Sequence, residues 1–131
     1  MSRRDDTVPM RHMLDYARET VAMVSGRSRG DADTDRMLQL ALTRLLEMIG
    51  EAASRVTVPG RARYRDIPWQ NIINTRSRIV HGYDTVNYDT VWKIIKDELP
   101  VLIAALERAL PGHVSSCPGF LRHHLSREKS R

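Results

Sequence analysis

Apolar residues at alternating three- and four-residue spacings are the feature that most limits how this chain can fold. They recur in four segments, at about residues 8–25, 34–58, 68–81 and 87–110. Such spacing puts the apolar side chains on one face of a helix. Strand signals are few, because the sequence has no alternating β-branched runs and no Asn-Gly or Asp-Gly turn. We therefore predict an all-α, up-and-down bundle of four to five helices.

Helix-ending and helix-capping residues set the predicted boundaries. Gly26 ends the first helix, Asp33 or Thr34 caps the second, and Gly82 stops the third after His81. Asn87 is the predicted cap of the fourth helix. Pro100 lies inside that helix and should kink it, since proline lacks the backbone N–H and crowds the preceding turn.

The length and the cysteine usage indicate one domain without disulfides. The chain has 131 residues and a single cysteine, Cys117. We expect a helical domain over residues 1–112, closed by Pro111-Gly112, and a basic, flexible tail over 113–131. No apolar run of signal-peptide or membrane-span type occurs, so we expect a cytoplasmic protein that does not enter a membrane.

The histidines do not form a metal-binding motif. No HExxH or Cys/His spacing is present, although His123-His124 in the tail could pick up a metal incidentally. Walker A, GxGxxG and serine-elbow motifs are also missing. We expect no metal site and no cofactor, so any catalysis must come from Arg76, His81 and their neighbours.

Arg76 stands where the helical pattern calls for an apolar residue. Positions 72, 73, 79 and 80 are isoleucine or valine, each three or four residues from Arg76. A guanidinium on an apolar face costs free energy unless it is paired or has a function. A salt bridge with Glu47 or Glu51 is one explanation, with His81 serving as a dipole partner at the helix end. Catalysis is the other.

An arginine and a histidine together suit metal-free cleavage of RNA. Histidine can take a proton from the 2′-hydroxyl or give one to the 5′-oxygen at neutral pH. A guanidinium offers forked donors to the charge that builds on phosphorus. Five residues turn roughly 140° on an ideal helix, and one histidine cannot be base and acid in one step. Both difficulties ease in a homodimer whose two chains form a composite cleft.

A basic connector precedes this region. Arg61, Arg63 and Arg65 surround Tyr64, and Arg78 follows within the third helix. These arginines could track an RNA backbone. A solvated connector with no ligand explains the same residues equally well.

The motifs resemble the HepT-like branch of the HEPN superfamily. The resemblance rests on Arg76-x4-His81-x-Tyr83 within residues 66–83, on Ile49-Gly-Glu-Ala-Ala53 upstream and on residues 91–100 downstream. It covers about residues 3–112.

This resemblance implies a dimeric, metal-independent endoribonuclease toxin of a type VII toxin–antitoxin module, with Arg76 and His81 as the RNase site. The implied antitoxin is a minimal, MntA-like nucleotidyltransferase that silences the toxin by adding AMP to Tyr83. A packing role for Tyr83 fits the same sequence.

One residue departs from the family pattern. Ser77 stands where the family commonly has asparagine after the motif arginine; its hydroxyl could still orient groups at the site, but it lacks the paired donor and acceptor of an amide. Two alternatives therefore remain: a catalytically inactive HEPN interaction module that dimerises and binds a nucleotidyltransferase, and a nucleotide-binding accessory subunit of that enzyme.

Overall fold

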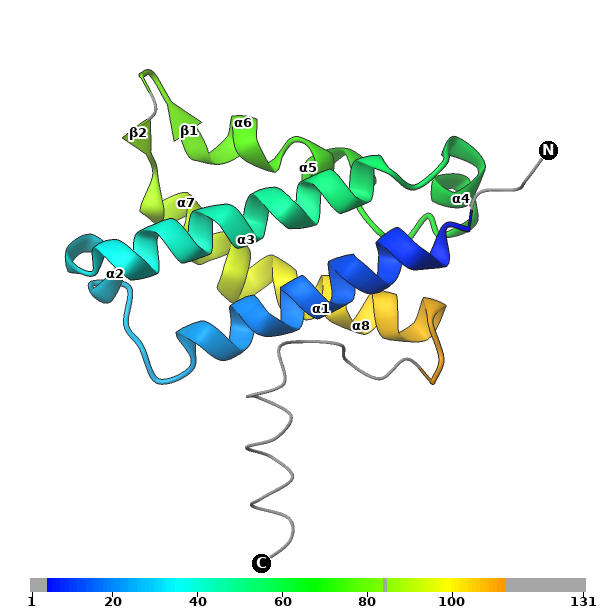
Figure 1. The fold of residues 1–131 in the computed structure, drawn as a ribbon, viewed down its shortest axis with the longest axis horizontal. Coiled ribbons are helices and arrows are strands. Elements are labelled where there is room, and N and C mark those ends of the chain that lie inside the picture. Colours follow the sequence, from blue (N-terminus) through cyan, green and yellow to red (C-terminus); the bar gives the residue numbers. More distant parts are fainter. Residues whose placement is uncertain (1–4, 84, 113–131) are drawn as a thin grey trace, which may run out of the picture.

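The computed structural model describes residues 5–83 and 85–112, and these residues form a helical bundle with one small hairpin (Figure 1). The predicted tail and its histidines and cysteine lie outside this range. The elements, in chain order, are α1 (Thr7–Val24), α2 (Asp31–Thr34), α3 (Arg36–Ser54), α4 (Val58–Arg63), α5 (Trp69–Ile73), α6 (Thr75–Ile79), β1 (Val80–His81), β2 (Thr85–Val86), α7 (Tyr88–Lys93), a π-helical turn η1 (Ile94–Glu98) and α8 (Leu99–Ala109). The predicted all-α class is confirmed.

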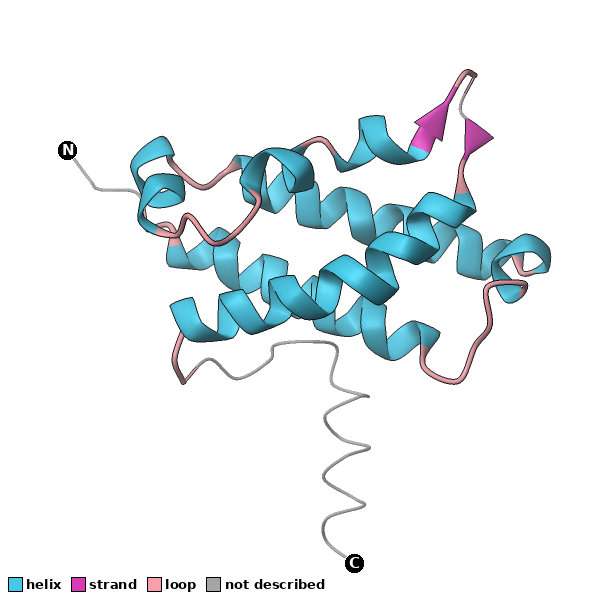
Figure 2. Ribbon diagram, turned by 180° about the vertical axis from the view of Figure 1, so that it is seen from behind, coloured by secondary structure: helices cyan, strands magenta, loops and turns pink. Residues whose placement is uncertain are grey.

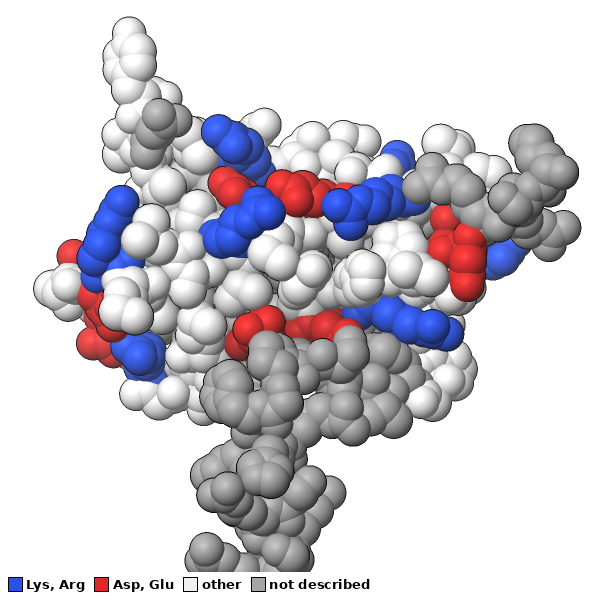
Figure 3. Space-filling model, in the orientation of Figure 1, with Lys and Arg blue, Asp and Glu red and all other residues white. Residues whose placement is uncertain are grey.

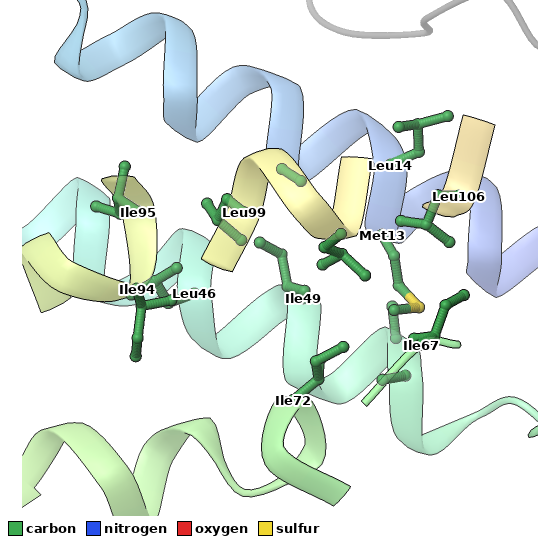
Figure 4. Packing of buried hydrophobic residues seen from close by; sticks show 14 of the residues in the cluster. Met13, Leu14, Leu46, Ile49, Ile67, Ile72, Ile94, Ile95, Leu99 and Leu106 are labelled. Carbon is green, nitrogen blue, oxygen red and sulfur yellow. The ribbon is translucent and has the colours of Figure 1, made fainter. Parts of the chain in front are cut away.

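Three long helical segments build the core. Helix α1 packs along α3 and α8, and the α5–α6 segment contacts both α3 and α7 (Figure 2). The interior is almost entirely aliphatic and methionine side chains, as Figure 4 shows around Met13, Ile49 and Leu106. Burying each large side chain of this kind stabilises the fold by about 1.5–3 kcal/mol before entropy is counted.

The first two helices begin and end near their predicted positions, with one correction. Asp35, and neither Asp33 nor Thr34, caps the long second helix, because its carboxylate accepts a hydrogen bond from the Leu38 N–H at 3.1 Å. Asp33 and Thr34 belong instead to the short helix α2. Asn87 caps α7 as predicted, since its side-chain oxygen accepts from the N–H groups of Asp89 and Thr90.

The fourth helix loses α geometry immediately before Pro100. Residues 94–98 form a π-helical turn, and Pro100 then occupies the first turn of α8, where a missing N–H costs little. The irregularity that the sequence predicts at Pro100 thus takes the form of a π-turn. Ile94, Ile95 and Leu99 remain buried through it.

The third predicted helix is wrong in its second half. Helix α5 ends at Ile73, α6 ends at Ile79, and His81 lies in β1, which pairs with β2 as an antiparallel hairpin. Val80 pairs with Val86 and His81 with Thr85. Gly82 has φ +60° and begins the hairpin turn, so its left-handed backbone serves a turn between strands and does not stop a helix.

No helix within the described part of the chain is long and apolar enough to cross a membrane.

Candidate functional site

Helix α6 turns its two polar motif residues outward. Thr75 and Ile79, four residues apart, are buried against the bundle, and the Thr75 hydroxyl donates to the Ile72 carbonyl at 2.6 Å. Arg76 and Ser77 therefore face solvent, and the Arg76 side chain is 70% exposed. The prediction that Arg76 lies in the middle of an apolar face is wrong, because the break at Asn74 changes the helical phase between α5 and α6.

The hairpin carries the other two motif residues. His81 is exposed in β1, and Tyr83 at the turn is fully exposed. The hairpin projects from one end of the bundle, directly after α6 (Figure 1). Because His81 follows the end of α6 in extended backbone, the 140° rotation expected on a continuous helix does not apply.

Glu47 on α3 is shared between two arginines. Its carboxylate lies 3.9 Å from Arg76 Nη1 and 3.5 Å from Arg44 Nη1, and Arg44 also donates to Glu51 at 3.1 Å. The bond to Glu51 is the largest cause of a raised pKa for Arg44. Figure 3 shows acidic side chains flanked by basic ones across this surface. The alternative of an Arg76 salt bridge with Glu47 is thus observed, at the long end of ion-pair distances.

A pocket of about 220 Å³ opens beside Arg76. One wall is a single face of α3 and the other is the α5–α6 segment. Its lining includes Glu47, Gly50, Glu51, Ser54, Ile73 and Arg76. The α3 residues follow the i, i+3, i+4, i+7 spacing of one helix face, which is the sequence signal that could have found the wall.

Arg78, two residues after Arg76, points to a different partner. Its guanidinium donates two hydrogen bonds to the Glu98 carboxylate, at 2.9 and 2.6 Å, and its side chain is only 28% exposed. This bidentate bond raises the pKa of Arg78 and ties α6 to η1. Glu98 carries no sequence signal for this role.

The basic connector lies far from the motif. Arg61, Arg63 and Arg65 are in or next to α4, which sits at the opposite end of the long axis from the hairpin in both ribbon views. Arg61 donates to the Ser54 carbonyl at 3.1 Å, whereas Arg63 and Arg65 are exposed. One chain therefore does not bring these arginines to His81.

Clusters of three or more His, Cys, Asp or Glu side chains able to hold a metal are absent among residues 5–83 and 85–112. The chemically versatile groups of this surface are a guanidinium, an imidazole, a phenol and hydroxyls. Together they can bind an anion, transfer a proton and accept a group on a phenolic oxygen.

Comparison with known proteins identifies the family. The family model described as ribonuclease HepT-like matches residues 13–109. A candidate RNase of Methanocaldococcus jannaschii is 26% identical over 82% of this chain and 98% of its own length. A candidate RNase of Caldanaerobacter subterraneus subsp. tengcongensis is 33% identical over 71% of this chain and 83% of its own.

A probable ribonuclease HepT of Thermococcus cleftensis is 31% identical over 56% of this chain and 67% of its own. No solved structure matches the chain at a significant level. The family match spans both the bundle and the Arg76–Tyr83 motif, which is where the resemblance of the sequence lies. The chain belongs to the HepT-like family of the HEPN superfamily.

Proposed function

We propose that this protein is a metal-independent endoribonuclease, the toxin of a toxin–antitoxin pair. The observation that carries the proposal is the exposure of Arg76 and His81 on adjoining elements, in a chain whose relatives are named as ribonucleases. Neither side chain is buried in the core, so neither is needed to fill it. Residues of these types supply the two things that RNA cleavage requires, proton transfer and anion stabilisation.

In the proposed reaction His81 moves protons and Arg76 binds phosphate. An imidazole takes the proton of the 2′-hydroxyl, the 2′-oxygen bonds to phosphorus, and the 5′-oxygen leaves with a proton from an imidazolium. The products are a 2′,3′-cyclic phosphate and a 5′-hydroxyl. Arg76 donates to the phosphoryl oxygens as charge builds on them. Ser77, exposed beside Arg76, orients a phosphate oxygen through its hydroxyl.

A second chain supplies the second imidazole. One His81 cannot accept and donate in the same step, so a homodimer with two copies facing one cleft completes the acid–base pair. The hairpin at one end of the bundle leaves His81 accessible to such a partner. In the same assembly Arg63 and Arg65 are proposed to contact the RNA backbone beyond the cleft, together with Arg61 and Arg78 if their present bonds open.

The deciding experiment is cleavage of total RNA by the purified protein in EDTA. Wild type should cut, and Arg76→Ala and His81→Ala should each lose at least about 100-fold in rate, the usual size of one acid–base or anion-binding group. Arg108→Ala is the matched control, because it removes an exposed arginine paired with Asp66. Cleavage that needs added metal, or that survives either motif variant, contradicts the mechanism.

We further propose that a minimal nucleotidyltransferase silences the protein by adding AMP to Tyr83. The phenol is fully exposed at the hairpin turn, where another enzyme can reach it. The phenolic oxygen attacks the α-phosphorus of ATP, and pyrophosphate leaves. Mass spectrometry after co-expression with the partner should show one AMP-sized adduct that Tyr83→Phe removes. An unmodified wild type, or an adduct on another residue, counts against this assignment.

An inactive interaction module is the second candidate. The observation in its favour is that Arg76 pairs with Glu47, and that Ser77 replaces the asparagine expected by resemblance. Such a protein would still dimerise and bind the nucleotidyltransferase. Binding of the partner by a wild type that never cleaves RNA would select this candidate.

A further inference from the structure

The pocket beside Arg76 is a built feature with a fixed floor. A Cβ on Gly50 would meet the Ile72 carbonyl oxygen at 2.8 Å, so only glycine lets α3 and α5 approach this closely. The floor thus joins two backbones of the bundle. The walls are Glu47, Glu51 and Ser54 on α3 and Ile73 opposite, with Arg76 among the lining residues. A volume of about 220 Å³ is below the roughly 300–1,000 Å³ of ordinary small-molecule sites. It suits a group the size of one nucleobase.

The lining selects the chemistry of the occupant. Ionised carboxylates only accept hydrogen bonds, so Glu47 and Glu51 can bind only the N–H or O–H donors of a ligand. They also repel phosphate, which leaves Arg76 as the position for the RNA backbone. Ile73 offers an apolar surface for a ring face. A neutral, planar base with N–H donors meets all three conditions, and single-stranded RNA exposes such bases for this kind of contact.

Glu51 is the more exposed of the two carboxylates that line the pocket. Its side chain is 51% exposed, against 19% for Glu47, which two arginines already contact. Arg44 pairs with Glu51 at 3.1 Å, but exposed pairs of this kind are worth only about 0–1 kcal/mol. A base can therefore compete for the Glu51 oxygens at small cost.

We propose that this pocket is a nucleobase subsite that prefers guanine in the RNA substrate. Guanine presents two adjacent donors, N1–H and the exocyclic amine, which match the two oxygens of Glu51. Adenine and cytosine place an acceptor beside their amine, and uracil has one N–H between two carbonyls. The subsite deepens the proposed ribonuclease function, because it lies next to the arginine that binds the phosphate.

The test measures base preference separately from cleavage. His81→Ala protein of full length is titrated with a fluorescent oligouridine that carries one central G, A, C or U, and binding is read by anisotropy. The G oligonucleotide should bind roughly 5- to 150-fold more tightly than the others, the usual range for one bidentate base contact. Glu51→Gln in the same background should remove this preference. Free GMP is added as a competitor: displacement of the RNA indicates a subsite that binds the base alone, and no displacement indicates a site that needs the RNA chain.

A matched carboxylate provides the control. Glu107 is 49% exposed and pairs with Arg18 at 2.7 Å, so Glu107→Gln changes the same chemistry away from the pocket and should keep the preference for G. Equal binding of the four RNAs, preference for another base, or a preference for G that survives Glu51→Gln overturns the proposal. A Glu51-dependent preference for G in a wild type that does not cleave RNA keeps the subsite and rejects the ribonuclease.

Discussion

Replacing Arg78 by lysine should lower stability and leave the charge of the surface unchanged. The variant keeps one cation but loses the fork that donates at 2.9 and 2.6 Å to Glu98. Hydrogen bonds to charged groups contribute about 1.5–3 kcal/mol, whereas fully exposed pairs contribute about 0–1 kcal/mol. The two side chains are 28% and 38% exposed, so screening removes much of the larger value. We expect a loss of about 1 kcal/mol, or roughly 4 °C in Tm for a domain of this size.

The assay is a double-mutant cycle by urea unfolding. Arg78→Lys, Glu98→Gln and the double variant should give a coupling of about 1 kcal/mol that falls in high salt, since the Debye length is only about 3 Å at 1 M. Salt is a better probe than alkali here, because the raised Arg78 pKa keeps the guanidinium charged at high pH. Arg108→Lys, whose exposed pair with Asp66 has a single bond, should be near neutral.

Zero coupling together with weaker RNA binding by Arg78→Lys would refute this reasoning. In that case the guanidinium would serve RNA, as the sequence suggested, and its bond to Glu98 would add nothing to the fold.

Substitutions at three further positions test the elements that position the site. Gly50→Ala puts a Cβ 2.8 Å from the Ile72 carbonyl oxygen. The cost of overpacking, about 1–3 kcal/mol, should outweigh the helix-propensity gain of about 1 kcal/mol, so the free energy of unfolding should fall. Unchanged stability in urea would contradict the close approach of the two backbones. Asn87→Ala should cost about 1 kcal/mol in thermal unfolding and Asn87→Asp should restore it, whereas equal losses would exclude a capping role. The hydrogen bond from the Leu38 N–H lowers the pKa of Asp35, so its stabilisation is present above the ordinary value of 3.8 and lost as pH falls through the lowered value. In acid, wild type should therefore lose stability relative to Asp35→Asn. Urea unfolding of both proteins from about pH 7 to pH 3 measures this change, and a stability difference that does not vary with pH would count against the capping bond.

The long helices could be predicted because their evidence is local. The apolar spacing of α1 and α3 and the cap at Asn87 depend on residues within one or two turns, and the structure keeps them. The helix break around Asn74 could not be predicted, because the apolar residues on both sides of it fit one continuous helical stripe. At the break the Thr75 hydroxyl donates to the Ile72 carbonyl, and beyond α6 the residue Val80 pairs with Val86. A strand of two residues has too little pattern to detect.

The sequence offers candidate residues for the site but not the surroundings of those residues. Arg76, His81 and Tyr83 follow from chemistry and from the family resemblance, and all three are exposed. The pocket needs α3 and α5 to meet at Gly50, a contact between residues far apart in sequence. Spacing along one helix shows which residues share a face, but it does not show which other element covers that face.

Arg76 and Arg78 show how placement decides what one residue type can do. They differ by two positions on α6, so they point to different sides of the helix. The guanidinium of Arg78 donates two short hydrogen bonds to the Glu98 carboxylate on η1. Arg78 would have to break both bonds to bind RNA phosphate. Arg76 faces Glu47 at 3.9 Å with 70% of its side chain exposed, so a phosphate displaces little. Of the two arginines, only Arg76 can therefore bind an incoming anion without loosening the attachment of α6 to the bundle.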